Sequence, residues 1–250
     1  MRTIATHTYE EMSSYVSDCF EEIVRKKPTA CMSCAAGTTQ EGLYKELASR
    51  FKKNGLSFRE LQFFNMDEYI GVNKEHPVSL NYFLEQNFYR IVDVDPAKVH
   101  VPKLTHLLPS NNSVYYDELI SGCGGLDLLV LGIGADGHIA FNMPDGVFHL
   151  HTHRERLTND IIARNTPFFS KSSDVPTHAV TIGVKTILDA KKIILMAHGD
   201  SKKKVLEQLL SNKMVTPLLP ASILWLHNDV TIIADQGTWG KEMNGGERIV

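Results

Sequence analysis

The chain has 250 residues, of which 43% are hydrophobic and 22% are charged, and its formal net charge is -3. This length and composition suit one large globular domain with ample material for an apolar core. The small negative charge gives no reason to expect nucleic acid or an anionic membrane as a partner, so a small ligand is the better expectation.

The N-terminal residues include no apolar run of signal-peptide length, and no stretch approaches the roughly 20 apolar residues that span a bilayer. We therefore expect a cytoplasmic protein with no membrane partner. The four cysteines, Cys19, Cys31, Cys34 and Cys123, are too few for a disulfide framework and are expected to be reduced. Cys31 and Cys34 form a C-x-x-C, but no second pair of this kind follows, so we expect two buried thiols rather than a redox pair or a metal site.

Hydrophobic periodicity predicts the first elements. Thr8 and Glu11 match a capping box, and apolar residues then recur at helical spacing, so the chain is expected to open with an amphipathic helix that ends near Pro28. The segment 29–36 has the pattern of a strand, and helical spacing resumes from Leu43. This order is a strand, a loop and a helix.

The same alternation continues to the end of the chain and predicts an α/β fold, a doubly wound three-layer sandwich with a mainly parallel sheet of six or seven strands. Further strands are expected at Leu61–Asn65, Leu126–Gly134, Ala179–Ile182, Lys192–Ala197 and Val230–Ala234, and further helices at Leu80–Ile91 and Ser201–Leu210. No repeat or linker marks a second domain, so residues 1–250 are expected to form one. Its polar, weakly periodic stretch 145–174 is expected to act as a lid.

Ligands collect at the carboxyl ends of parallel strands, where loops converge and helix N-termini point outward. After the strand at 29–36, Gly37, Thr38 and Thr39 precede a helix and could surround an anion with backbone N–H groups. An ordinary strand-to-helix turn has the same composition. After the strand at 61–65 come Asp67 and Glu68, where a partly buried carboxylate could serve as a general base, or could cap the next turn.

The third strand end is the most informative. In residues 132–142, Gly132 and Gly134 let the backbone approach a ligand, and Asp136 lies two residues from His138, near enough for the two side chains to orient each other. A histidine held by a carboxylate is a plausible proton carrier, although a structural histidine fits the pattern too. The nucleotide fingerprint G-x-G-x-x-G is incomplete because His138 occupies its last position, which excludes a dinucleotide site.

Taken together, these segments resemble the glucosamine-6-phosphate deaminase/isomerase family, whose relatives include the 6-phosphogluconolactonases. The similarity covers most of the chain, and it is the combination of segments, rather than any single one, that is specific for the family. It rests on FNMDEYIG (64–71), the HP-x-S that begins at His76, GIGADGHIAFN (132–142), LTNDIIARN (157–165) and AVTIGVKTILDAKKIILMAHG (179–199).

The resemblance implies roles for the candidate residues. Asp67 would move a proton between C1 and C2 of the open-chain sugar, and His138, oriented by Asp136, would assist opening of the pyranose ring. The loop of Gly37, Thr38 and Thr39 would hold the phosphate together with Lys202. The family needs no metal or organic cofactor. The expected partner is a small sugar phosphate, with a homo-oligomer as a further expectation.

Several positions depart from the family pattern. Met143 stands where the family has an acid that partners the histidine, and Asp145 could compensate if the loop bends back. His153 and Glu155 stand where typical deaminases have phosphate-contacting Arg and Lys, and Pro167 replaces an arginine. Phosphate binding could then fall to other arginines of the lid, namely Arg154, Arg156 and Arg164.

Three functions remain open at this point. The leading interpretation is an aldose–ketose isomerase/deaminase that acts on an amino-sugar 6-phosphate. The second is a sugar-lactone hydrolase of the 6-phosphogluconolactonase type, in which His138 would activate water. The third is a sugar-phosphate sensor without catalytic activity, suggested by the missing acid at Met143. Retention of Asp67, Asp136 and His138 favours an enzyme.

Overall fold

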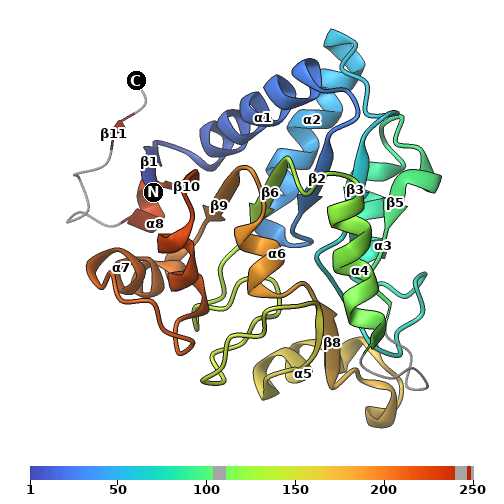
Figure 1. Cartoon of the computed structure of the whole chain (residues 1–250), viewed down its shortest axis with the longest axis vertical. Coiled ribbons are helices and arrows are strands. Elements are labelled where there is room, and N and C mark those ends of the chain that lie inside the picture. The colour runs from blue at the N-terminus through green and yellow to red at the C-terminus, as the bar shows by residue number, and fades with distance from the viewer. Residues whose placement is uncertain (104–110, 240–246, 249–250) are drawn as a thin grey trace.

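The main β-sheet has eight strands in the order β11-β1-β10-β9-β6-β2-β3-β5, and every pairing in it is parallel (Figure 1). The structure, a computed structural model, describes residues 1–103, 111–239 and 247–248. In chain order the strands are β1 (Arg2–Thr6), β2 (Cys31–Cys34), β3 (Gln62–Phe64), β5 (Val99–His100), β6 (Leu128–Leu131), β9 (Ile193–Ala197), β10 (Val230–Asp235) and β11 (Glu247–Arg248).

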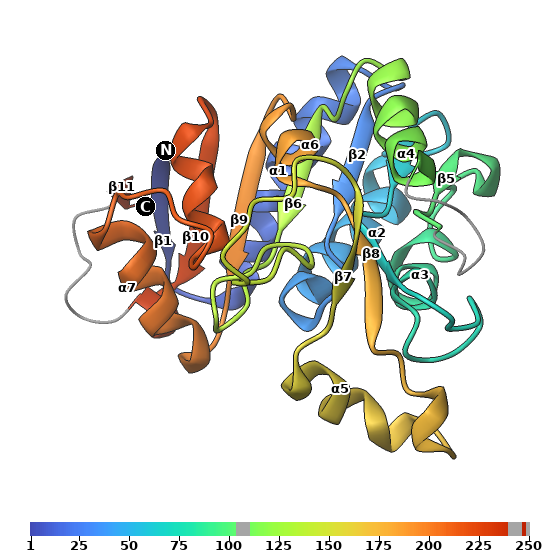
Figure 2. The same cartoon turned by 60° about the horizontal axis from the view of Figure 1, so that its bottom comes forward.

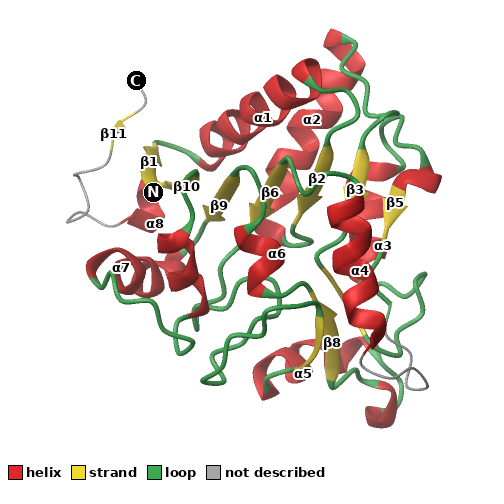
Figure 3. Cartoon of the chain, viewed as in Figure 1, coloured by secondary structure: helices red, strands yellow, loops and turns green. Residues whose placement is uncertain are grey.

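Helices cover both faces of this sheet, as Figure 3 shows in red. One face packs against α1 (Tyr9–Lys26), α2 (Glu41–Asn54) and α3 (Leu80–Leu84), which continues as a π-helix over Glu85–Tyr89. The other face packs against α4 (Asn111–Gly122), α6 (Val184–Leu188), α7 (Lys203–Ser211) and α8 (Gln236–Trp239). Each face has its own cluster of buried apolar side chains, so the predicted three-layer sandwich is confirmed.

A second, antiparallel sheet joins β4 (Asp67–Tyr69), β8 (His178–Thr181) and β7 (His153–Arg156) in the order β4-β8-β7. Asp67 pairs with Thr181, which in turn pairs with His153. Together with α5 (Asn159–Asn165), this sheet extends away from the main sheet (Figure 2). A small third cluster of buried apolar residues, which includes Phe141 and Leu157, lies beside it.

The order of the main sheet reverses between β2 and β6. From β2 the chain adds β3 and β5 on one side, and from β6 it adds β9 and β10 on the other. The loops that leave the carboxyl ends of β2 and β6 therefore diverge to opposite sides. This topological switch point is where an open α/β sheet has its natural binding crevice.

The prediction for the N-terminal segment is right about the start of the first helix and wrong about the element that opens the chain. Thr8 is confirmed as the N-cap, because its hydroxyl accepts the Glu11 N–H at 3.1 Å, while the Glu11 carboxylate accepts the N–H of His7, one residue before the N-cap, at 2.7 Å. The expectation that the chain opens with a helix is wrong, because β1 precedes it. This five-residue strand is too short for its alternating burial to stand out from the sequence.

Later segments also differ from expectation. The strand expected at Ala179–Ile182 exists as β8, but it belongs to the antiparallel sheet rather than the parallel one. The irregular stretch 145–174 contains β7 and α5, so it is more regular than predicted. The thiols of Cys31 and Cys34 lie buried and free, as predicted, in β2. Within the described part of the chain, no helix is both long and apolar enough to cross a membrane.

Candidate active site

A cavity of about 710 Å³ opens at the switch point. It is bounded by the loops that follow β2, β3, β6 and β9 and is closed on one side by α5. Its size suits a small phosphorylated metabolite. Nine of the site residues predicted from the sequence line this one cavity: Gly37, Thr38, Thr39, Asp67, Gly132, Gly134, Asp136, His138 and Lys202.

The loop after β2 is built around a buried glutamine that the sequence analysis did not single out. Gln40 ends the 3-10 turn that carries Thr38 and Thr39, and its side chain lies between Gly37 and Gly132. A Cβ atom on either glycine would come within 3.2 Å of the Gln40 amide. The amide nitrogen Nε2 is buried and has no hydrogen-bond partner among the described residues. Gln40 itself is one of the residues that line the cavity.

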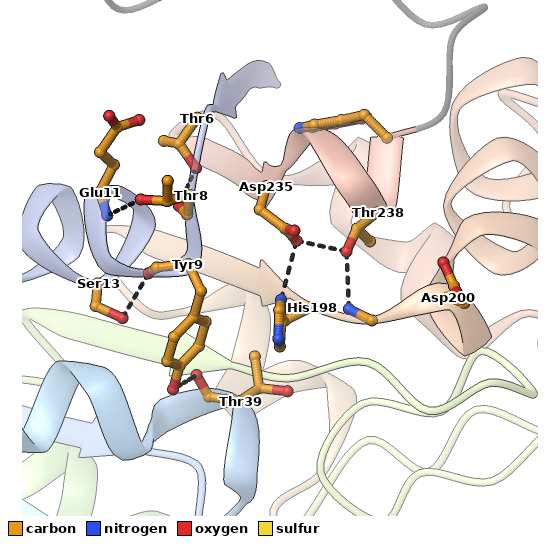
Figure 4. A network of polar contacts seen from close by, with 12 residues as sticks. Thr6, Thr8, Tyr9, Glu11, Ser13, Thr39, His198, Asp200, Asp235 and Thr238 are labelled. Atoms are coloured by element: carbon orange, nitrogen blue, oxygen red, sulfur yellow. Dashed lines mark hydrogen bonds and ion pairs between the residues drawn. The ribbon is translucent and has the colours of Figure 1, made fainter.

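A polar network holds this loop against the neighbouring strand ends (Figure 4). The Tyr9 hydroxyl donates to the carbonyl of Thr39 at 3.1 Å, and its ring packs on the His198 ring, 4.5 Å away between centroids. His198 Nδ1 lies 3.0 Å from Asp235, and Asp235 also accepts from Thr238. His198 lines the cavity too. Its position directly after β9 could have identified His198 as a site residue from the sequence, but it was not among the predicted residues.

Asp67 and Glu68 lie in different environments, and Glu68 is the acid that caps the next turn. The Glu68 carboxylate caps α3, since it accepts from the Ser79 hydroxyl at 2.8 Å and from the N–H groups of Leu80 and Asn81 at 3.0 and 2.9 Å. Asp67 instead lines the cavity and is 8% exposed. Burial, reinforced by the nearby charge of Glu68, raises the pKa of Asp67 to about 8.

Asp136 and His138 form a close pair. His138 Nδ1 lies 2.6 Å from Asp136 Oδ1, and the His138 N–H donates to the same oxygen at 3.2 Å. Burial disfavours the Asp136 carboxylate, but these hydrogen bonds outweigh it and lower its pKa to about 2. Both side chains pass over Gly134, where a Cβ atom would lie 2.2 Å from His138 Nδ1. The glycine is therefore needed for the pair to form.

Two cationic side chains reach the cavity from opposite sides. Lys202 ends the 3-10 turn after β9, and Arg164 projects from α5. Burial lowers the pKa of Lys202, the charge of Asp136 opposes this shift, and the charge of Arg164 adds to it. Lys202 and Arg164 therefore both place positive charge at this cavity. Arg154 and Arg156, the other arginines proposed for the phosphate, lie on the exposed face of β7 and do not line the cavity.

Asp145 does not supply the acid that the family resemblance led us to expect at position 143. Met143 is buried in the apolar cluster with Phe141, and neither it nor Asp145 lines the cavity. The Asp145 carboxylate accepts the Val147 N–H at 3.0 Å and lies 3.5 Å from His149. The loop does not bend back in the way that compensation by Asp145 would require, and Asp136 is the acid that contacts His138.

Comparison with known proteins places this geometry in context. A family model described as glucosamine-6-phosphate isomerases/6-phosphogluconolactonase matches residues 5–233. A glucosamine-6-phosphate deaminase of Clostridium acetobutylicum is 37% identical over 236 residues, which are 94% of this chain and 98% of that protein. A second, from a Thermoanaerobacter species, is also 37% identical over 236 residues and is covered to 93% of its length.

Solved structures agree at the level of the fold. A monomeric glucosamine-6-phosphate deaminase superposes with a TM-score of 0.89 at 32% identity, over 95% of this chain and 98% of that one. A 6-phosphogluconolactonase from Trypanosoma cruzi has a TM-score of 0.73 at 21% identity, over 95% of both chains. At that identity the second likeness concerns the fold alone.

Proposed function

Because the chain belongs to the glucosamine-6-phosphate isomerase/6-phosphogluconolactonase family, we propose that it converts an amino-sugar 6-phosphate, glucosamine 6-phosphate or an isomer, into a ketose phosphate and ammonia. One observation carries the proposal. A buried carboxyl group with a raised pKa, an imidazole held by a second carboxylate, and two cations all line one cavity.

The phosphate group is assigned to the Lys202 side of the cavity. Lys202 and Arg164 supply charge-assisted hydrogen bonds, and Thr38 and Thr39 supply hydroxyls and the backbone N–H groups of a turn. Arg164 comes from α5, so a bound phosphate would draw this helix toward the main sheet. Residues 145–174 would then act as the lid that the sequence predicts.

His138 is assigned to ring opening. Its Nδ1 faces Asp136, which fixes the ring orientation and leaves Nε2 for the substrate. The imidazole takes the proton of the C1 hydroxyl and returns a proton to the ring oxygen as the C1–O5 bond breaks. The Asp136 carboxylate stabilises the imidazolium formed in between.

Asp67 is assigned to the proton transfer on carbon. The carboxylate removes the C2 proton of the open-chain aldose and delivers it to C1, while one proton moves from the C2 ammonium group to O1, which leaves a protonated imine at C2. Water adds to that carbon, and ammonia departs to give the ketose phosphate. A carboxyl group with a pKa near 8 is a stronger base than an exposed aspartate, which suits removal of a proton from carbon.

The test is product formation by the purified protein. Glucosamine 6-phosphate and galactosamine 6-phosphate are supplied separately, and ammonia and ketose phosphate are measured. We expect equimolar release of both products from one of these sugars and none with Asp67→Asn. A folded wild-type protein that releases ammonia from neither sugar would overturn the proposal.

Two further assays separate the alternatives. Hydrolysis of 6-phosphogluconolactone by the same preparation would indicate the lactonase activity, and ligand-dependent thermal stabilisation without turnover would indicate a sensor. The homo-oligomer and the cytoplasmic location stay predictions. Light scattering of the purified protein measures the first, and fractionation of the source cells measures the second.

A further inference from the structure

Three metal-ligating side chains gather outside the active-site cavity. His149, His153 and Glu155 each offer one donor atom, and these atoms all lie within 4.8 Å of one another. None of the three lines the cavity. They occupy the loop before β7 and β7 itself, in a segment for which the sequence analysis expected no metal site.

The strand places two of these ligands on one face. His153 and Glu155 alternate along β7 with Arg154 and Arg156, which point to the exposed side. His153 Nε2 lies 3.2 Å from Glu155 Oε2. A tetrahedral zinc ion with donors at about 2.0 to 2.1 Å spaces its ligand atoms about 3.3 Å apart. The two donor atoms already have the separation that a shared ion requires.

The hydrogen bond on the other side of the His153 ring fixes the ring so that Nε2 faces Glu155. His153 Nδ1 lies 3.0 Å from the carbonyl oxygen of His151, which can only accept, so Nδ1 carries a proton. In the neutral ring, Nε2 then presents a lone pair to the Glu155 carboxylate. A proton or a metal ion between Nε2 and the carboxylate would join the two groups, and a histidine with its Nδ1–H on a carbonyl is the usual arrangement of a metal ligand.

Glu155 needs a positive partner for a second reason. The residue is 6% exposed, and its other oxygen accepts the N–H of Arg156 at 2.9 Å. Among the residues whose side chains the structure describes, its ion-pair partner is His153, and no lysine or arginine contacts it. A carboxylate buried to this extent is paired with a cation or coordinates a metal.

His149 completes the cluster from a firmly held loop. Its ring stacks on that of His153 with 4.3 Å between centroids. Its carbonyl accepts the Val184 N–H at 2.9 Å at the start of α6, and the loop lies so close to Gly183 that a Cβ there would be 2.3 Å from the Leu150 carbonyl oxygen. Two stacked imidazolium ions would repel each other, whereas two neutral imidazoles can bind one ion.

We propose that His149, His153 and Glu155 bind one divalent transition-metal ion, with Zn²⁺ the best match to two imidazoles and a carboxylate. Water fills the fourth position. The ion ties the loop at residues 145–152 to β7, and β7 is joined through Thr181 to Asp67. Its role is structural: it fixes the small sheet whose first strand carries the proposed base. The site does not depend on the proposed reaction.

The test uses full-length protein without a histidine tag, stripped with a chelator and then titrated with Zn²⁺ by calorimetry. Co²⁺ serves as a second probe, because its visible absorption bands report a tetrahedral site. We expect one equivalent to bind. At a hundredfold excess over Kd, Zn²⁺ should raise the thermal midpoint by roughly 5 to 10 °C.

Variants connect this binding to the cluster. His153→Gln and Glu155→Gln should each raise the Kd at least a hundredfold and abolish the thermal gain. His151→Gln is the matched control, because His151 belongs to the same segment but faces Asp117 at 3.3 Å, and it should keep the wild-type Kd within threefold. Absence of equimolar binding to the wild type, or unchanged binding by His153→Gln and Glu155→Gln, would overturn the proposal whether or not the chain releases ammonia.

Discussion

Replacing Asp67 by asparagine should remove activity and stabilise the fold, by an amount that depends on pH. The folded-state pKa of about 8 lies above the ordinary value of 3.8, so the folded chain keeps a proton that the unfolded chain loses between these values. Stability is then lost as pH rises through this window. At 1.36 kcal/mol per pH unit, the cost of Asp67 is at most about 1.7 kcal/mol at pH 5 and about 5 kcal/mol at pH 8.

Urea unfolding of both proteins between pH 5 and pH 8 measures this effect. We expect the Asp67→Asn variant to gain stability relative to the wild type as pH rises, while its ammonia release falls by a factor of about 10² to 10⁴. Asp127 is the matched control, because it is equally buried but pairs with Lys27 and Lys191, which hold its pKa below the ordinary value against the effect of burial. Asp127→Asn should destabilise the fold, with little change over this pH range. Identical pH dependence of Asp67→Asn and the wild type would refute the reasoning.

Three further substitutions test other parts of the site. Lys202→Met should raise the KM for the sugar phosphate about 10- to 100-fold through loss of a charge-assisted contact, whereas Arg154→Met, on the exposed face of β7, should leave it unchanged in the same steady-state assay. His138→Gln should lower kcat about 100-fold with the circular dichroism spectrum retained, and an unaltered kcat would remove the residue from the mechanism. Gly134→Ala should lower both kcat and the thermal midpoint, because the new methyl group would clash with His138. Gly122→Ala should change neither, because a Cβ atom at that position would have no neighbouring atom within 4 Å.

The sequence predicted the location of the site better than its detailed chemistry. Thr38, Asp67 and His138 were chosen because they follow strands, and parallel strands end at one edge of the sheet, so the structure brings them to one cavity. Lys202, which came from the family resemblance, lines the same cavity. Without the family resemblance, which points to Asp67, the sequence pattern could not decide which of Asp67 and Glu68 caps the next turn. Which acid caps the turn depends on the three-dimensional path of the chain after Tyr69. That path brings the start of α3 close enough for Glu68 to cap it.

Elements with weak patterns were missed for physical reasons. The β7 strand has the sequence His-Arg-Glu-Arg and no apolar residue, since its buried positions hold polar side chains that contact each other. The β8 strand has a clear apolar pattern, but that pattern does not reveal which sheet it joins. Gln40 gave no signal because its importance comes from packing between Gly37 and Gly132, which lie far apart in the chain.

The two aspartates of the cavity illustrate how one fold prepares the same side chain for two tasks. Asp136 accepts hydrogen bonds from His138, so it stays ionised and can orient the imidazole throughout a reaction. Asp67 receives no hydrogen bond from the described residues, and burial keeps its pKa near neutral pH, where it can gain and lose a proton. Carboxyl groups whose environments push their pKa values apart, here to about 8 and about 2, mark a proton carrier beside a fixed anion. If both aspartates were structural, burial of Asp67 without a partner would only lower the stability of the fold. The gain in stability of the Asp67→Asn variant over the wild type measures how large this cost is.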